Sequence, residues 1–561
     1  MRETGGPIGA ARGRAATGDT GHGGYVLGKR KEFTAALRKV PEGPATLAFV
    51  GATVFTGQRG ARREQAVAIR GDVVLAVGSD ADIRRHINAD TRVVNAEGRT
   101  VLPGLIETHG HLPDIVERAI GHVDRPSDIS DMPAIDGWVR VVGADPGSID
   151  AFDRLRRGRP GYWESHSGAQ SKANSTALDL ARRYWSTQKT FYGKPNPTFG
   201  DPTRLPVPPG GRVDERTGGL FYANNLIFDG RDASGRLPDY EELGGVMPQM
   251  SYEILKRPLE HTMRYFAANG ITGFHNMMGT PHDLMTLARL EQDGLLTTRV
   301  YTVQGMSQAK LHTMVTPRFL ALMDEVRRSF NSDRLWTGMV KFNDSGTSVE
   351  ELAQEINRLN GAGLQAAIHT HGDKLEAIAR ANVDHPGAAK ELRHRLEHTM
   401  GDVARADQLG TGGTIQFSAP PSSLARHQNA LRHWGAGTDW DVITDINPMR
   451  MLGLATGTLG SIDEALHGYT SNAAWLGHAE DMVGSLEPGK KADVVLLNRD
   501  ILAEPSNASH ARPLMTVVDG KVVFEAPNAN GDPVLASYDH WLREVQAAGL
   551  AAAAAAEKTR K

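Results

Sequence analysis

The segment Thr108-His109-Gly110-His111 carries the first side chains with metal-binding chemistry. It follows residues 101–106, an apolar stretch with the composition of a buried strand. Residues two apart in a strand share a face, so we expect His109 and His111 to point the same way at the strand end. Two neighbouring imidazoles can chelate one cation. Such pairs are common, so this pair alone indicates a metal site only weakly.

Three further candidates also stand where predicted strands end. His369 follows residues 364–368, His398 follows the next predicted strand, and Asp439 follows residues 435–438. In a (β/α)8 barrel the C-terminal ends of the strands deliver side chains to the catalytic face. Four histidines and one aspartate at successive strand ends therefore predict a metal site, although each histidine taken singly can also be a core residue.

Lys341 lies within the apolar run Met339-Val340-Lys341-Phe342. A lysine among buried strand residues is costly unless it has a partner. One interpretation is a side chain that extends to solvent. The other is a neutral amine that takes up carbon dioxide and becomes a carbamate bridging two metal ions. A cationic, partly dry site lowers the pKa of a lysine, which would allow the second interpretation.

Composition limits the chemistry and the partners. The chain has no cysteine, so a metal must be held by His, Asp, Glu or a modified lysine. Its net charge is -3, with basic residues spread along the chain, which predicts no nucleic-acid partner. No stretch approaches the ~20 apolar residues of a membrane span. We expect a cytoplasmic protein that binds a small-molecule substrate, with a homo-oligomer left open.

The elements that must position these residues alternate between strand and helix. The clearest unit begins at residues 339–342, and Ser348 and Glu351 are spaced as the capping box of the following helix. Repeated βα units predict a parallel sheet, and their extent favours a closed (β/α)8 barrel over residues 102–479. Residues 112–250 fit this alternation poorly, so we expect an insertion there.

The two ends of the chain differ from the middle. Residues 45–101 and 480–525 are rich in β-forming residues and each contains a hairpin pattern, the second around Asp519-Gly520. We expect these segments to form one composite β-sandwich, with two separate β tails as the alternative. Residues 1–44 are predicted to be a disordered or extended leader, and residues 526–561 a helical tail.

Taken together, these motifs resemble the amidohydrolase superfamily, and within it amidohydrolase family 3, which includes N-substituted formamide deformylases. The resemblance runs in the expected order from about residue 45 to residue 525. His166-Ser167 and residues 174–178 resemble an insertion motif of that branch. The other matching segments are residues 102–111, 340–342, 368–373, 393–398, 437–440 and 484–493.

The resemblance implies one or two divalent metal ions. His109 and His111 would bind the more buried ion, and His369 and His398 would bind the second. Zn²⁺ is the expected cation, although iron and manganese also suit His and carboxylate ligands.

The resemblance also implies roles for two other residues. Lys341, carboxylated, would bridge the metals, and Asp439 would complete the first metal's ligands and carry the proton. Asn276 departs from the family pattern, because an acid usually follows that barrel strand.

The expected reaction is hydrolysis of a non-peptide, amide-type C–N bond by metal-activated water. Two alternatives stay open: the same site hydrolysing an ester, lactone or carbamate, and a non-catalytic barrel scaffold. Arg395 and Glu397 are expected to form an internal ion pair. The candidate substrate contacts, each of which can equally be structural, are His166, His275, His371 and Trp440.

Overall fold

The structure is a computed structural model, and it describes most of the 561-residue chain. The described residues are 40–112, 114–155, 158–165, 170–191, 194–207, 212–214, 219–221, 246–277, 279–307, 315, 317–342, 348–369, 374–398, 403–418, 433–440 and 446–560. Nearly all of the predicted leader lies outside them. Within these ranges, no helix has both the length and the hydropathy that crossing a membrane requires.

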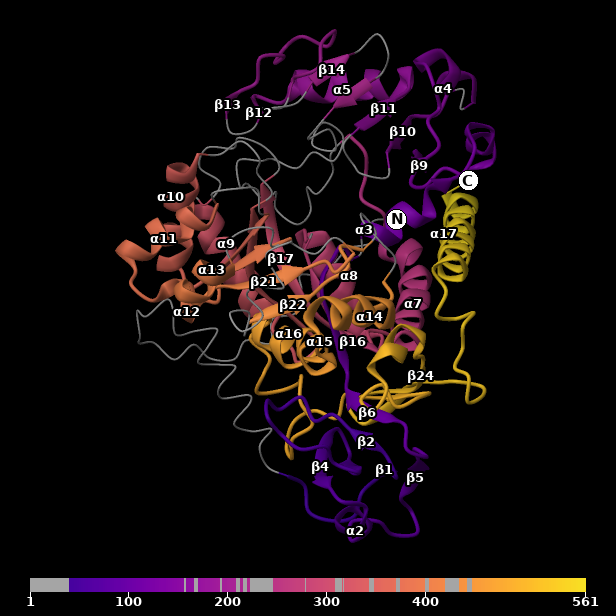
Figure 1. The fold of residues 1–561 in the computed structure, drawn as a ribbon. Helices are drawn as coiled ribbons and strands as arrows, with labels where there is room; N and C mark the ends of the chain where they lie inside the picture. Colours follow the sequence, from indigo (N-terminus) through magenta and orange to yellow (C-terminus); the bar gives the residue numbers. More distant parts are fainter. Residues whose placement is uncertain are drawn as a thin grey trace.

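Parallel strands form the centre of the molecule (Figure 1). There are eight in this sheet, in the order β22-β21-β20-β19-β18-β17-β16-β7. The sheet is nearly closed, because Gly110 at the end of β7 forms a parallel bridge with Trp440, just after β22. The predicted (β/α)8 barrel is thus confirmed. The strand bounds are Leu105–Gly110 (β7), Ile271–Asn276 (β16), Arg299–Ser307 (β17), Leu335–Phe342 (β18), Gln365–His369 (β19), Arg395–Glu397 (β20), Gly412–Ile415 (β21) and Trp434–Ala436 (β22).

Strand β18 shows why the sequence forms this barrel. Every residue of β18 is buried, as expected for a parallel strand covered on both faces. The predicted capping box starts the next helix: Ser348 Oγ accepts from the Glu351 N–H, and the Glu351 carboxylate accepts from the Ser348 N–H. The helices of this part of the chain are Tyr252–Ala268 (α7), Pro281–Gln292 (α8), Pro317–Ser329 (α9), Val349–Gly361 (α10), Lys374–Asp384 (α11), Ala388–Glu391 (α12), Val403–Leu409 (α13), Pro448–Leu459 (α14), Ile462–Tyr469 (α15) and Ser471–Leu476 (α16).

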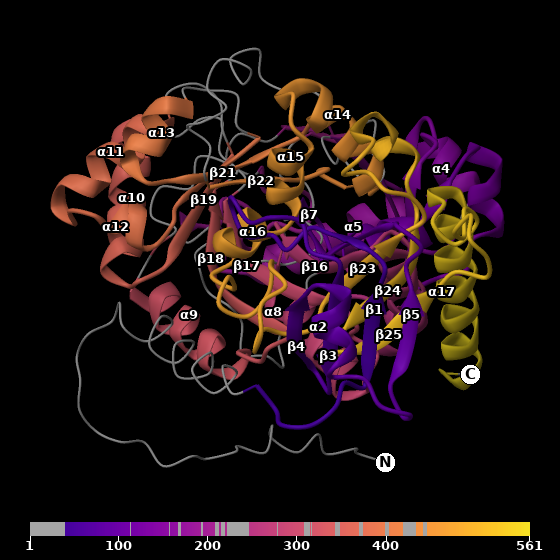
Figure 2. The same ribbon diagram turned by 60° about the horizontal axis from the view of Figure 1, so that its bottom comes forward.

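Two smaller sheets lie at the end of the barrel that faces away from the strand C-termini (Figures 1 and 2). One has the order β4-β3-β1-β5 and the other β2-β6-β23-β24-β25, so the second sheet joins both ends of the chain. A shared apolar core packs between them and includes Phe49, Ile69, Val494 and Val517. The elements are Leu47–Val50 (β1), Thr53–Val54 (β2), Ala66–Arg70 (β3), Val73–Gly78 (β4), Asp80–Arg84 (α2), Arg92–Asn95 (β5), Thr100–Pro103 (β6), Val494–Leu497 (β23), Pro505–His510 (η4), Pro513–Val518 (β24) and Lys521–Glu525 (β25).

The connection between the composite sheet and the barrel corrects one sequence-based expectation. Residues 101–106 were expected to form one strand, but the chain divides there into β6 and β7. The break is at Gly104, where a Cβ atom would lie 2.0 Å from Thr272 Oγ1. Only glycine fits this close approach, so the chain passes from one sheet to the other at this residue.

A buried ion-pair network joins the same two layers. Arg299, the first residue of β17, donates to both carboxylate oxygens of Asp493 at 2.8 and 2.9 Å. It also pairs with Asp519 in the turn between β24 and β25. Arg299 is almost fully buried, so these carboxylates offset its desolvation.

The insertion after β7 forms a sheet of its own, with the order β14-β15-β11-β10-β9-β8. It lies at the opposite end of the barrel from the composite sheet (Figure 1). Its elements are Asp114–Ile120 (α3), His122–Val123 (β8), Pro126–Asp131 (η1), Val139–Gly143 (β9), Ile149–Leu155 (α4), Gly161–Glu164 (β10), Gln170–Ala173 (β11), Ser175–Thr187 (α5), Thr190–Phe191 (β12), Lys194–Pro195 (β13), Arg212–Asp214 (β14) and Gly219–Phe221 (β15).

The chain ends in the predicted helix, Tyr538–Arg560 (α17). Figure 2 shows it lying along one side of the molecule. Trp541 is buried against Tyr265 of α7, with ring centroids 5.7 Å apart, and Trp541 Nε1 donates to Thr262 Oγ1. The tail therefore contributes to the core that surrounds the barrel.

Candidate metal centre

The predicted metal-binding residues come from five strands of the barrel. His109 lies in β7, and His111 follows that strand directly. The others stand at or just beyond the C-terminal ends of their strands, which is the catalytic end of such barrels. They are Lys341 in β18, His369 at the end of β19, His398 after β20 and Asp439 after β22.

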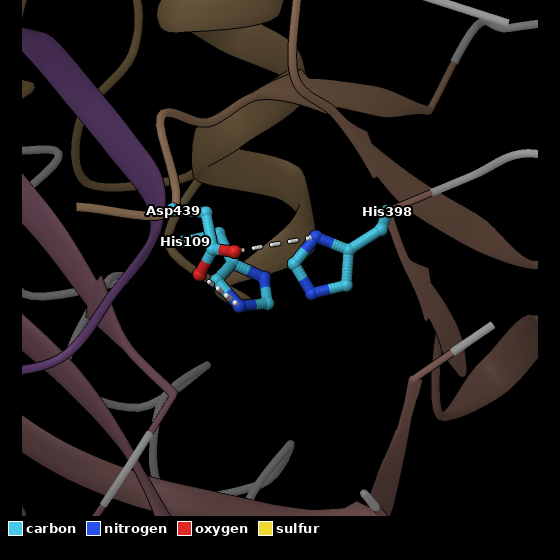
Figure 3. Close-up of side chains that lie close together, drawn as sticks. All are labelled: His109, His398 and Asp439. Atoms are coloured by element: carbon cyan, nitrogen blue, oxygen red, sulfur yellow. Dashed lines mark ion pairs between the residues drawn. The ribbon is translucent and has the colours of Figure 1, made fainter. Parts of the chain in front are cut away.

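Asp439 lies at the centre of the group. Its Oδ1 atom is 3.0 Å from His111 Nε2 and 3.4 Å from His109 Nε2, and its Oδ2 atom is 3.8 Å from His398 Nδ1. Figure 3 shows the last two imidazoles facing the carboxylate. One ligand atom from each of His109, His398 and Asp439 lies within 4.8 Å of the others, a grouping that can hold one metal ion.

The two remaining candidates border this group. Lys341 Nζ is 3.5 Å from His109 Nε2. The rings of His369 and His398 are 4.6 Å apart between centroids, and those of His398 and His109 are 4.4 Å apart. The structure thus brings together all six residues that the sequence singled out as metal ligands.

Burial varies across the site. The side chain of His109 is fully buried, whereas that of His111 is 14 % exposed. The His111 side of the group is therefore the more open to solvent, and His109 forms its inner wall.

Burial also sets the charge states. It lowers the pKa of His109 well below its usual value, and it lowers the pKa of His398; nearby Lys341 adds to both shifts. Burial would raise the pKa of Asp439, but the adjacent imidazoles outweigh it and hold that pKa well below the usual range. The pKa of Lys341 falls to about 8, mainly through burial. Neutral imidazoles and an ionised carboxylate are the forms that bind metals.

Two of these residues adopt a backbone conformation that is rare outside glycine. His398 has φ of 57° and Asp439 has φ of 54°. Left-handed non-glycine residues cost about 1–3 kcal/mol and persist where surrounding contacts hold them. The Asp439 N–H donates to the His109 carbonyl at 2.9 Å, and this hydrogen bond holds Asp439 beside strand β7.

Two buried glutamates at the site had no predicted role in metal binding. Glu397 pairs with Arg395, as expected from the sequence, but its Oε2 atom also lies 2.6 Å from His109 Nδ1. Glu107 Oε1 accepts from the backbone N–H groups of His109 and Thr438 at 2.8 and 2.9 Å. The sequence did offer a signal for Glu107, because it lies two residues before His109 and therefore on the same face of the strand.

The predicted substrate contacts are the least supported by the geometry. His275 Nδ1 bonds Arg395 at 2.9 Å, and its ring packs against Gly477 inside the barrel. Trp440 is fully buried among aromatic rings, including Phe266 and Trp541. Both rings are buried and packed among other side chains, so the geometry lends no support to a substrate contact, and that role stays a prediction for both. His166 and His371 lie outside the described residues.

Asn276, the departure from the family pattern, has a local structural role. Its side-chain oxygen accepts from the Leu112 N–H at 2.8 Å, and its amide donates to Thr302 Oγ1 at 3.0 Å. It therefore links β16 to the start of the insertion and to β17.

The chain is similar along most of its length to two characterised sequences. Protein LONG AFTER FAR-RED 3 of Arabidopsis thaliana is 24 % identical, over 86 % of this chain and 92 % of that protein. N-substituted formamide deformylase of Arthrobacter pascens is 23 % identical, over 82 % of this chain and 95 % of that protein.

Solved structures share the fold. An uncharacterized metal-dependent hydrolase from Pyrococcus furiosus superposes with a TM-score of 0.59 at 18 % identity, covering 81 % of this chain and 99 % of that one. A family model described as the amidohydrolase family matches residues 227–524, which is more than half of the sequence. The matched segment includes Lys341, His369, His398 and Asp439. The chain therefore belongs to the amidohydrolase family and is a hydrolase that acts on carbon–nitrogen bonds.

Proposed function

We propose that this enzyme hydrolyses a non-peptide, amide-type C–N bond of a small molecule, with water activated by a divalent metal ion. The observation that carries the proposal is the meeting of imidazoles and one carboxylate at the barrel mouth, with ligand atoms of His109, His398 and Asp439 within 4.8 Å. Barrel closure brings the strand ends together, but it does not require the side chains there to be metal-ligand types, so the donor set carries the proposal.

The donor set fits a metal of the zinc type. Neutral imidazole nitrogens and a carboxylate oxygen are the ligands that Zn²⁺ takes in cysteine-free sites, and we propose Zn²⁺ as the cation. His111 Nδ1 is buried with no hydrogen-bond partner among the described residues, so the ring has a free nitrogen near the site. His109 and His398 would hold the ion together with Asp439, and His111 and His369 border them.

A bound divalent cation would supply Lewis acidity, which acidifies water and polarises the substrate carbonyl. Asp439 accepts the proton of the attacking water and returns it to the leaving nitrogen as the C–N bond breaks. Its position against three imidazoles keeps the carboxylate ionised and in place. Substrate approaches from the His111 side, because that side chain is the more exposed.

We also propose that Lys341 is carboxylated. The neutral amine nitrogen adds to the carbon of carbon dioxide and releases one proton, which leaves a carbamate anion beside His109. Support comes from the buried position of Lys341 and from its pKa of about 8, which leaves part of the amine neutral near neutral pH. With ¹³C-bicarbonate, we expect a carbamate carbon signal in the wild type that Lys341→Arg lacks.

The similarity to an N-substituted formamide deformylase makes N-substituted formamides the first amides to test. The experiment combines metal analysis of the purified protein with a panel of small amides matched to esters, lactones and carbamates. We expect bound metal, amide turnover that a chelator abolishes, and loss of both in His109→Asn. His385→Asn, which changes an exposed histidine on the α11–α12 turn, is the matched control. Metal-free protein without turnover, or turnover of esters alone, contradicts the proposal.

A further inference from the structure

The ring of His109 lies between the candidate metal site and a buried carboxylate. Its Nε2 atom faces Asp439 and Lys341, at 3.4 and 3.5 Å, and its Nδ1 atom lies 2.6 Å from Glu397 Oε2. The side chains of His109 and Glu397 are both fully buried. The contact joins residues 288 positions apart, from strands on different sides of the barrel.

Three further hydrogen bonds reach the Glu397 carboxylate, and it accepts in each of them. Arg395 Nε donates to Oε1, Arg395 Nη2 donates to Oε2 at 3.3 Å, and Thr414 Oγ1 donates to Oε2 at 2.8 Å. An ionised carboxylate only accepts hydrogen bonds. The short contact to Nδ1 is therefore a hydrogen bond in which the imidazole donates, and the Nε2 lone pair faces the site.

We propose that Glu397 is a positioning residue that holds His109 in its Nδ1–H tautomer and thereby makes Nε2 the metal-ligating atom. The proposal deepens the proposed function and rests on it. A carboxylate that accepts from the second nitrogen of a ligating imidazole fixes the tautomer and the orientation of the ring. Arg395 in turn fixes the carboxylate, because it also donates to the Thr108 carbonyl at 2.7 Å.

Glu397→Gln tests this with little change of shape. Arg395 Nε still requires an acceptor at the Oε1 position, so the glutamine oxygen occupies that position and its NH2 group occupies the Oε2 position. There the NH2 group faces His109 Nδ1 and donates to it. The imidazole must then carry its proton on Nε2, which removes the lone pair that faces the metal site.

Glu107→Gln is the matched control. It makes the same Glu-to-Gln replacement at a second buried glutamate that also contacts His109, but through the backbone N–H. A glutamine oxygen can still accept from the His109 and Thr438 N–H groups, so the ring tautomer does not change. Burial raises the pKa of Glu107 to about 8, so the control changes no charge near neutral pH. It separates the tautomer from the general effect of placing an amide at a buried glutamate of the site.

The primary measurement is the affinity of the metal-free proteins for Zn²⁺, by competition with a chromophoric chelator, together with their thermal midpoints. We expect Glu397→Gln to bind about 10- to 100-fold more weakly than the wild type, the usual effect of losing such a partner. Glu107→Gln should keep the wild-type affinity. Equal affinity in folded Glu397→Gln, or an equal loss in both variants, overturns the proposal. A wild-type protein that binds no divalent metal refutes the proposed function instead.

A second measurement does not depend on metal binding or on the folding of the Glu397 variant. In metal-free wild-type protein labelled with ¹⁵N-histidine, the imidazole signals that disappear in His109→Asn identify this ring. We expect them to show a protonated Nδ1 and an unprotonated Nε2. The opposite tautomer overturns the positioning role even if the enzyme binds metal.

Discussion

Acidification is expected to weaken the barrel around His394, the residue that precedes β20. His394 is fully buried, its Nδ1 accepts from the Ala366 N–H at 3.0 Å, and its Nε2 bonds Asn360 Oδ1 at 2.7 Å. Both nitrogens are therefore satisfied by the neutral ring. A proton added to Nδ1 would face another donor, and burial lowers the pKa of His394 to about 3.

The size and sign of the effect follow from the two pKa values. Histidine in the unfolded chain has a pKa of about 6.5. As the pH falls below that value, the unfolded chain binds a proton that the folded protein does not, so stability is lost. The contribution is complete above pH ~6.5 and disappears progressively toward pH ~3. At pH ~5 the loss amounts to about 2 kcal/mol for this one residue.

Hydrogen exchange of the Ala366 amide measures this opening locally, because that N–H bonds the ring itself. We compare the wild type with His394→Gln at pH ~7.5 and pH ~5, after correction for intrinsic exchange rates. A glutamine can accept and donate in the same places without titrating. The opening free energy should fall by about 2 kcal/mol more in the wild type than in the variant. Equal falls in both proteins refute the reasoning, and a smaller fall in the wild type does so as well.

Three further predictions concern the site and its supports. Asp439→Asn keeps the shape of the side chain, and asparagine tolerates the positive φ of this residue, so the protein should fold. Its kcat on the best amide substrate should fall about 100- to 10,000-fold. An unchanged kcat contradicts the proton-transfer role. Arg299→Met leaves Asp493 and Asp519 buried without their main partner and should cost about 3–5 kcal/mol, read as a lower urea midpoint; an unchanged midpoint contradicts a stabilising network. Gly104→Ala should lower the thermal midpoint, because the added Cβ would clash with Thr272 Oγ1 at a cost of about 1–3 kcal/mol. Adding Thr272→Ala should recover part of this loss. If it recovers nothing, the destabilisation comes from the backbone at residue 104 and the clash is not its cause.

Much of the fold follows from local patterns. Helix α10 and its capping box depend on residues within one turn of each other, and the β24–β25 hairpin depends on Asp519-Gly520, both of which have positive φ. The same patterns predicted the alternation of strands and helices that forms the barrel. They missed the division at Gly104, because both sides of Pro103-Gly104 are apolar and read as one strand, although a Pro-Gly pair often marks a break.

The candidate ligands could also be read from the sequence, because strand ends in a parallel barrel converge whatever the loops do. His109, His369, His398 and Asp439 each follow from that rule. Substrate contacts could not be read in this way. Trp440 neighbours Asp439 in sequence, but consecutive residues point in different directions, and its ring packs into the core beside α7 and α17.

The sequence by itself determined which chemistry is available here: no thiolates, many imidazoles, and ligand-type residues at successive strand ends. Only the tertiary structure decided how those groups are held. Two contacts, Glu397 with His109 and Arg299 with Asp493, join segments that are far apart in the sequence. Nothing in the local sequence of one segment predicts its partner in the other. Such partners become visible only after the barrel closes, because burial removes the water that would otherwise satisfy these charges.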